Sequence, residues 1–138
     1  MSEPTTLPQK NHVTGILREK HEDRIVLELP GTNYLLHLNT YKPIETPLGK
    51  KITGTVRAQS SRIDVSRTGG RYIEPVIGRP RRIQGVIRAV DPVERTVTIN
   101  ATVPIVCRTD VHQNPSQFNV GDFVTCGIHA GASFTAAV

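Results

Sequence analysis

The amino-acid sequence predicts an all-β protein made of two tandem, five-stranded small barrels. Three observations lead to this prediction. The second half of the 138-residue chain repeats the first, apolar residues alternate with polar ones at a period of two, and glycine and proline interrupt potential helices. A hydrophobic content of 37% and the absence of Trp limit the chain to modest cores of Val, Ile and Leu. This length suits one ordinary domain or two very small ones.

The internal repeat is visible at both ends of the two copies. The first copy begins HVTGILREKHEDRIVLELPG at His12, and the second begins RIQGVIRAVDPVERTVTINAT at Arg82. Further on, LGKKITGTVRAQSSRIDV from Leu48 aligns with VGDFVTCGIHAGASFTAAV from Val120. This agreement predicts an internal duplication. The aligned pairs include Val13 with Ile83, Gly15 with Gly85, Ile25 with Val97, Ile52 with Val124, Val56 with Ile128 and Ala58 with Ala130.

The chain divides into four parts. Residues 1–11 are polar and contain two prolines, which predicts a disordered leader. Residues 12–65 are expected to form the first barrel repeat, residues 66–82 a basic connector rich in Gly and Pro, and residues 83–138 the second barrel repeat. The β-branched runs RIVLEL and TVTIN follow the turn-forming strings KHED and DPVE, so each copy is expected to consist of short antiparallel strands.

The last strand-like segment of each copy shows the clearest alternation. Its apolar residues are expected to face inward and the intervening residues, such as Thr53 and His129, outward. Five short strands cannot cover both faces of a flat sheet, so each copy is expected to close into a barrel. Gly15 and Gly85 would allow the strands to coil. The residues predicted to face inward are Ile52, Gly54, Val56 and Ala58, then Val124, Cys126, Ile128 and Ala130.

These short strands and mid-strand glycines resemble the OB-fold. The string Gly-x-x-Val/Ile-Thr at residues 49–53 and 121–125 is similar to that of the molybdate-binding Mop/TOBE barrels, which often occur in tandem. That resemblance implies binding of a small oxyanion. Residues 64–69, Asp-Val-Ser-Arg-Thr-Gly, match the DxSxxG string of PilZ domains, which implies binding of cyclic di-GMP. A small-anion module, for an oxyanion or a cyclic dinucleotide, is therefore one alternative.

Positive charge is concentrated in residues 57–82, RAQSSRIDVSRTGGRYIEPVIGRPRR. This stretch holds seven arginines and no lysine against Asp64 and Glu74, and so accounts for the whole net charge of +5. Together with the pI of the whole chain, which is near 9.6, this stretch predicts a non-catalytic binding protein for nucleic acid or another polyanion. Arginines would contact phosphates and tyrosines would stack on bases. The predicted site residues are Arg57, Arg62, Arg67, Arg71, Tyr72, Arg79, Arg81, Arg82 and Tyr34.

A structural or assembly module is the main alternative from another class. The same arginines would then pair with Asp and Glu at an interface between the two barrels or between subunits. A homo-oligomer is expected under this hypothesis. Buried, paired arginines would favour assembly, whereas a continuous exposed basic groove would favour polyanion binding.

No catalytic or cofactor motif is present in the sequence. Nucleophile elbows, Walker loops and GxGxxG strings are absent, so neither an enzyme nor a cofactor is expected. Cys126 and His129 look like half a zinc site, but residues i and i+3 of a strand point to opposite faces, so no metal is expected. Cys107 and Cys126 are instead predicted to be buried thiols. The sequence shows no signal peptide or long apolar run, which predicts a cytoplasmic protein without a membrane partner.

Overall fold

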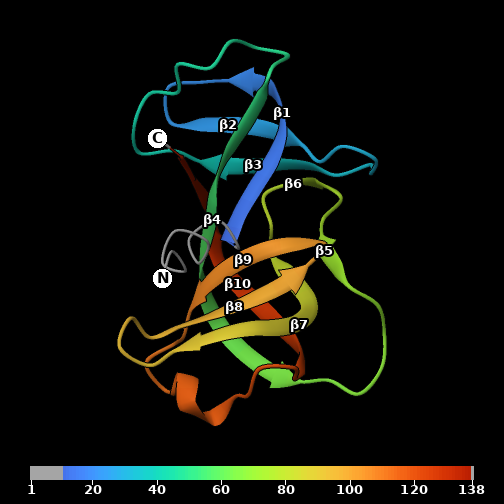
Figure 1. Ribbon diagram of the computed structural model, residues 1–138, viewed down its shortest axis with the longest axis vertical. Coiled ribbons are helices and arrows are strands. Elements are labelled where there is room, and N and C mark those ends of the chain that lie inside the picture. The colour runs from blue at the N-terminus through green and yellow to red at the C-terminus, as the bar shows by residue number, and fades with distance from the viewer. Residues whose placement is uncertain (1–10, 138) are drawn as a thin grey trace, which may run out of the picture.

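A computed structural model describes residues 11–137 and confirms the all-β fold class (Figure 1). That range contains no α-helix, and none of its segments is a helix long and apolar enough to cross a membrane. Apart from Asn11, the predicted leader lies outside the described residues. The elements are β1 (His12–Lys20), β2 (Arg24–Glu28), β3 (Leu35–Asn39), β4 (Lys51–Val65), β5 (Tyr72–Glu74), β6 (Ile77–Gly78), β7 (Arg82–Asp91), β8 (Thr96–Ala101), β9 (Val103–Arg108), the 3-10 turn η3 (Pro115–Gln117) and β10 (Phe123–Ala136).

The strand pairings form two closed rings. In the first ring, β1 pairs with β2, β2 with β3, β3 with β10, β10 with β4, and β4 with β1. In the second ring, β7 pairs with β8, β8 with β9, β9 with β4, β4 with β10, and β10 with β7. The β3–β10 and β4–β9 pairs are parallel and the others in the rings antiparallel. Figure 1 shows β4 and β10 running along the molecule from one ring into the other.

The last strands of each half are longer than the sequence predicts. β4 is one strand of 15 residues: residues 51–55 pair with β1 in the first ring, and residues 56–59 pair with β9 in the second. No Gly or Pro stands between Gly54 and Gly69, so neither of the two strongest strand breakers interrupts this segment. β10 crosses in the opposite direction over 14 residues. Each half of the chain thus supplies the closing strand of the other ring.

The two rings use matching strand registers. Ile25 lies opposite Leu38 in the first ring, as Val97 lies opposite Cys107 in the second. A register shift interrupts the β1–β2 pair and the β7–β8 pair at the same place. Positions of one ring can therefore be compared with positions of the other one by one.

The prediction that Ala130 faces inward is wrong. Ala130 is exposed and has a left-handed backbone with φ 62°, and Gly131 follows with φ 77°. β10 shifts register between His129 and Ala132, so that Ala132, which is only 1% exposed, lies opposite Ala58. The two extra residues form a bulge, and alternation cannot be extrapolated across residues that leave the ladder.

One cluster of mainly aliphatic side chains fills the interior of both rings. Val56 and Ile128, which the sequence aligns, are both buried in it. Cys107 and Cys126 are free and buried, which confirms the prediction of buried thiols. A hydrogen bond with Cys126, together with burial, raises the pKa of the Cys107 thiol. Cys107 is therefore held in its neutral form inside the second ring.

The connector, residues 66–82, is bound to both rings. Its β5 pairs with β7 of the second ring, and its β6 pairs with β3 of the first. The amide of Leu35 donates to the Val76 carbonyl at 2.9 Å, and the amide of Ile128 donates to the Arg81 carbonyl at 2.8 Å. These bonds hold the later part of the connector beside β3 and β10.

Candidate polyanion-binding surface

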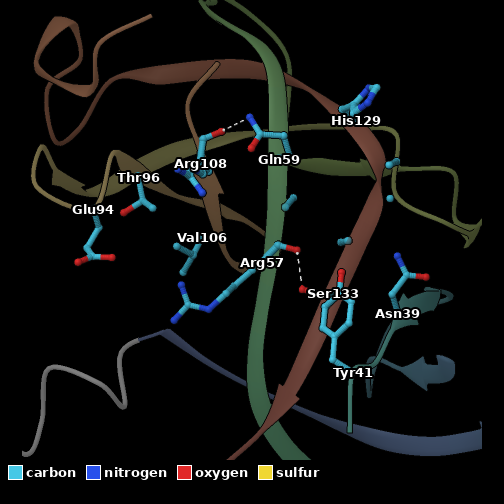
Figure 2. A pocket seen from close by; sticks show the side chains of 14 residues that line it. Asn39, Tyr41, Arg57, Gln59, Glu94, Thr96, Val106, Arg108, His129 and Ser133 are labelled. Carbon is cyan, nitrogen blue, oxygen red and sulfur yellow. Dashed lines mark hydrogen bonds between the residues drawn. The ribbon is translucent and has the colours of Figure 1, made fainter. Parts of the chain in front are cut away.

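A groove of about 470 Å³ lies where β4 and β10 cross between the rings (Figure 2). Side chains reach it from several strands, and Figure 2 shows them on both sides of β4. We call it the junction groove. It is lined by Asn39, Tyr41, Arg57, Ala58, Gln59, Glu94, Thr96, Val106, Arg108, His129, Ala130, Gly131, Ala132 and Ser133.

Small residues meet at the centre of the junction groove. Ala58 and Ala132 lie directly opposite each other on β4 and β10, and the bulge residues Ala130 and Gly131 come just before. A Cβ placed on Gly131 would lie 3.7 Å from the Cβ and Cδ atoms of Arg79. The side chain of this connector arginine therefore lies against the bulge, beside the groove.

Two rows of outward-facing residues cross the groove from strand to strand. Residues directly opposite each other on paired strands present their side chains on the same face of the sheet. Because β4 and β10 belong to both rings, these rows join the rings into one surface. The first row is Val106, Arg57, Ser133 and Asn39, and the second is Thr96, Arg108, Gln59 and His129.

Arg57 and Arg108 bring positive charge to the groove. Both side chains are exposed, and neither forms an ion pair within residues 11–137. Two side chains of the rows form hydrogen bonds with the main chain of these arginines. Gln59 Nε2 donates to the Arg108 carbonyl at 3.3 Å, and Ser133 Oγ donates to the Arg57 carbonyl at 3.4 Å. Glu94 also lines the groove and carries a negative charge. Guanidinium groups on a fixed backbone, without a carboxylate partner, suit phosphate or another anion.

A second hollow, of about 430 Å³, adjoins the junction groove. The two hollows share Gln59, Arg108 and His129, and Arg95 and Asp110 also line the second one. Arg95 donates through Nη2 to the Gln113 carbonyl at 3.0 Å, so its guanidinium is partly engaged. The concave surface therefore continues past the groove along the second ring.

All seven predicted arginines are exposed, but they are not gathered in one site. Arg57 lines the groove and Arg79 lies against the bulge. Arg62 on β4 and Arg82 on β7 lie opposite Gly127 of β10, one on each side. The remaining predicted arginines lie in the connector: Arg67 and Arg71 before β5, and Arg81 after β6.

Arg62 is the predicted arginine that has an acidic partner in residues 11–137. Its Nε donates to Asp64 Oδ1 at 2.8 Å, and this hydrogen bond raises the pKa of the Arg62 guanidinium. Both side chains are well exposed, so the pair contributes little to stability. The other six arginines make no ion pair in the described part of the chain.

Neither predicted tyrosine lines the junction groove. Tyr34 is half-buried, and its hydroxyl oxygen accepts from the Ile73 amide at 3.1 Å, so it joins the connector to the first ring. Tyr72 is half-buried on β5, opposite Gln84. The aromatic side chain of the groove is Tyr41, which follows β3 and is 81% exposed.

Sequence reasoning missed most of the groove. Part of the groove was predictable from the sequence. Asn39 and Arg108 each end the third strand of a half, and alternation points Gln59 and His129 outward. The pairing that brings these residues together was not visible, because β9 pairs with β4 across the two halves of the chain. The missed residues include Asn39, Tyr41, Gln59, Arg108, His129 and Ser133.

Cys126 and His129 lie on opposite faces of β10, as alternation predicts. Cys126 is buried in the second ring, whereas His129 is exposed in the groove. Within residues 11–137, no group of three or more His, Cys, Asp or Glu side chains could hold a metal ion.

Comparisons with protein-family models, with curated proteins and with solved structures find no match to this chain.

Proposed function

We propose that the protein is a non-catalytic binding protein for nucleic acid or another polyanion. We further propose that its rings are two tandem OB-like barrels, which arose by duplication and exchange their closing strands. The matching registers and the five-stranded closure of each ring support this architecture. OB-like barrels commonly bind oligonucleotides on their surfaces, which is an analogy at the level of the fold.

The observation that carries the binding proposal is the exposure of the arginines. All seven are exposed, and six have no acidic partner within residues 11–137. Arg57, Arg79 and Arg108 lie at the junction groove, so part of the excess charge borders a concave surface. Unpaired guanidinium groups along such a surface attract phosphates and release the counterions of a polyanion.

The same observation weighs against an assembly role for the arginines between the two rings. Such a role requires arginines that are buried and paired with acids, and the strands that join the rings are instead held by ladder hydrogen bonds and aliphatic packing. An interface between subunits is the remaining assembly hypothesis. Sedimentation of the free protein at low and high salt tests it: a stable dimer that dissociates in the arginine variant below would favour it over polyanion binding.

The experiment is titration of a labelled single-stranded oligonucleotide, followed by fluorescence anisotropy at several salt concentrations. In the variant Arg79→Gln/Arg81→Gln/Arg82→Gln, affinity should fall, and the slope of log K against log salt should flatten by about 2, from about 0.7 per lost phosphate contact. The matched control is Lys50→Gln/Lys51→Gln/Arg88→Gln. It removes the same charge from exposed residues that do not line the groove.

The control should lose much less affinity than the connector variant. Equal losses would mean that only net charge matters. Wild-type protein that retains no oligonucleotide at a low salt concentration of about 50 mM would contradict the proposed function.

A further inference from the structure

We infer that the ligand is a single strand of nucleic acid, and that it crosses the junction groove with a phosphate at the β10 bulge and a base stacked on Tyr41. This inference rests on the proposed function and adds the class of nucleic acid and its place on the molecule. Three features carry it: a bulge whose two residues leave the ladder, two arginines, and an exposed aromatic ring, all lining one groove.

The bulge places main chain outside the ladder at the groove. Ala130 and Gly131 have no partner residue on β3, β4 or β7. Both residues line the groove. Backbone amides that have left a ladder can donate to phosphate oxygens.

Arg57 and Arg108 add charge beside these amides. They lie on neighbouring parallel strands, and register places Arg57 opposite Val106 and Arg108 opposite Gln59. Figure 2 shows both arginine side chains on the same side of β4, across from Ser133 and Tyr41. A phosphodiester backbone following the two rows would therefore meet a guanidinium group on each row.

Tyr41 supplies a surface for a base. It is 81% exposed, and neither its ring nor its hydroxyl makes a hydrogen bond within the described residues. It lines the groove together with Ser133, and Figure 2 shows both on the side of β4 away from Arg57. Bases of a duplex are already stacked and paired, so an exposed tyrosine can stack only on a base of a single strand.

The polar side chains between these groups suit backbone binding better than readout of one base. Asn39, Gln59 and Ser133 offer small neutral groups, and Glu94 adds one carboxylate that repels phosphate. Binding should therefore tolerate sequence changes, and DNA and RNA of the same base sequence should both bind. Removal of the Glu94 charge should strengthen binding, an effect that damage to the fold would not mimic.

The test measures affinity for a single strand and for a duplex of the same length, of about 12 nucleotides, within the range of about 4–16 nucleotides that one OB-like unit covers. Tyr41→Ala should weaken single-strand binding by about tenfold and leave duplex binding unchanged, whereas Tyr41→Phe should retain the wild-type affinity. Equal binding by Tyr41→Ala and wild-type protein would overturn the stacking role.

Charge variants test the phosphate contacts. Arg57→Gln/Arg108→Gln should weaken single-strand binding and reduce the salt slope by about 1.4, at about 0.7 for each lost contact. Arg88→Gln/Lys51→Gln is the matched control, and Glu94→Gln should bind more tightly than wild type. Melting curves for all variants should match that of wild type, because these side chains are exposed or partly exposed at the surface.

The outcomes separate this inference from the function on which it rests. If no oligonucleotide binds wild-type protein at low salt, the proposed function fails. If oligonucleotides bind and respond to the connector variant but not to Tyr41→Ala or Arg57→Gln/Arg108→Gln, only the place of binding is wrong. A preference for duplex, or complete competition by cyclic di-GMP or inorganic phosphate at equal concentration, would also overturn the inference.

Discussion

β4 and β10 make the same crossing between the rings with different backbones. β4 keeps an alternating pattern of buried and outward residues from Lys51 to Ser60. β10 leaves the ladder at Ala130 and Gly131, where it adds two residues that line the junction groove. The difference shows how one arrangement serves two purposes: the regular segment of β4 joins the rings, and the bulge of β10 places main chain outside the ladder at the groove.

The interiors of the two rings show a second difference at matched positions. Gly54 of the first ring corresponds to Cys126 of the second, and Phe134 corresponds to Ser60. In the first ring, Gly54 lies against the phenyl group of Phe134. In the second ring, Cys126 Sγ lies 3.4 Å from Ser60 Oγ. The volume lost at one position is restored at the other, as close packing requires. The pairs that establish the match are Val13–Gly54 with Ile83–Cys126, and Val56–Phe134 with Ile128–Ser60.

The largest effect is expected for Phe134→Ala. This side chain from the end of β10 is buried in the first ring, and its loss should lower the free energy of unfolding by about 3–5 kcal/mol. The substitution Ser60→Ala, at the matched position, should cost only about 1 kcal/mol. Urea denaturation measures both. Because β4 and β10 belong to both rings, each variant should unfold in a single transition. Separate transitions for the two rings would show that the rings unfold independently, contrary to this expectation.

The volume exchange is tested by Gly54→Ala. A Cβ at Gly54 would lie 2.5 Å from Cζ of Phe134 and would also meet the Thr135 carbonyl oxygen, so this variant should lose about 1–3 kcal/mol. In the double variant with Phe134→Ala, the clash with the phenyl ring is removed, and the contact with the Thr135 carbonyl oxygen remains. The double variant should therefore be about 1 kcal/mol more stable than the sum of the single losses predicts. Simple additivity would show that the two positions are not coupled.

The sequence was sufficient for the fold class and for much of the inward-facing set. Alternation alone places Val56 and Ile128 inside and His129 outside, because a strand has a period of two. It failed at Ala130, because alternation was extended through Gly131, although a glycine inside a strand often marks a bulge. It also missed the groove, which depends on the non-local pairing of β4 with β9. The arginine-rich stretch identified charged, exposed residues, but their neighbours in space come from distant segments.

The smallest effect is expected at the bulge itself. Ala130→Gly should stabilise the protein by about 0.5 kcal/mol. Glycine adopts the left-handed conformation without the cost of about 1–2 kcal/mol that a Cβ imposes there, and this gain exceeds the entropic cost of glycine. Ala132→Gly, two residues further along in the regular ladder, should instead destabilise it by about 1 kcal/mol. Thermal melting distinguishes the two signs. If both substitutions destabilise equally, Ala130 is not in the left-handed conformation.

The most direct measurement is a two-dimensional NMR titration of isotope-labelled protein with an unlabelled single strand of about 12 nucleotides. The amide signals of Ala130 and Gly131 should move with the added ligand and saturate together with those of Tyr41 and Arg57. These residues line one groove, and the two bulge residues have no partner residue in the β4–β10 ladder. Shifts confined to residues 66–71, with the signals of the bulge unchanged, would contradict the assignment of the junction groove as the binding surface.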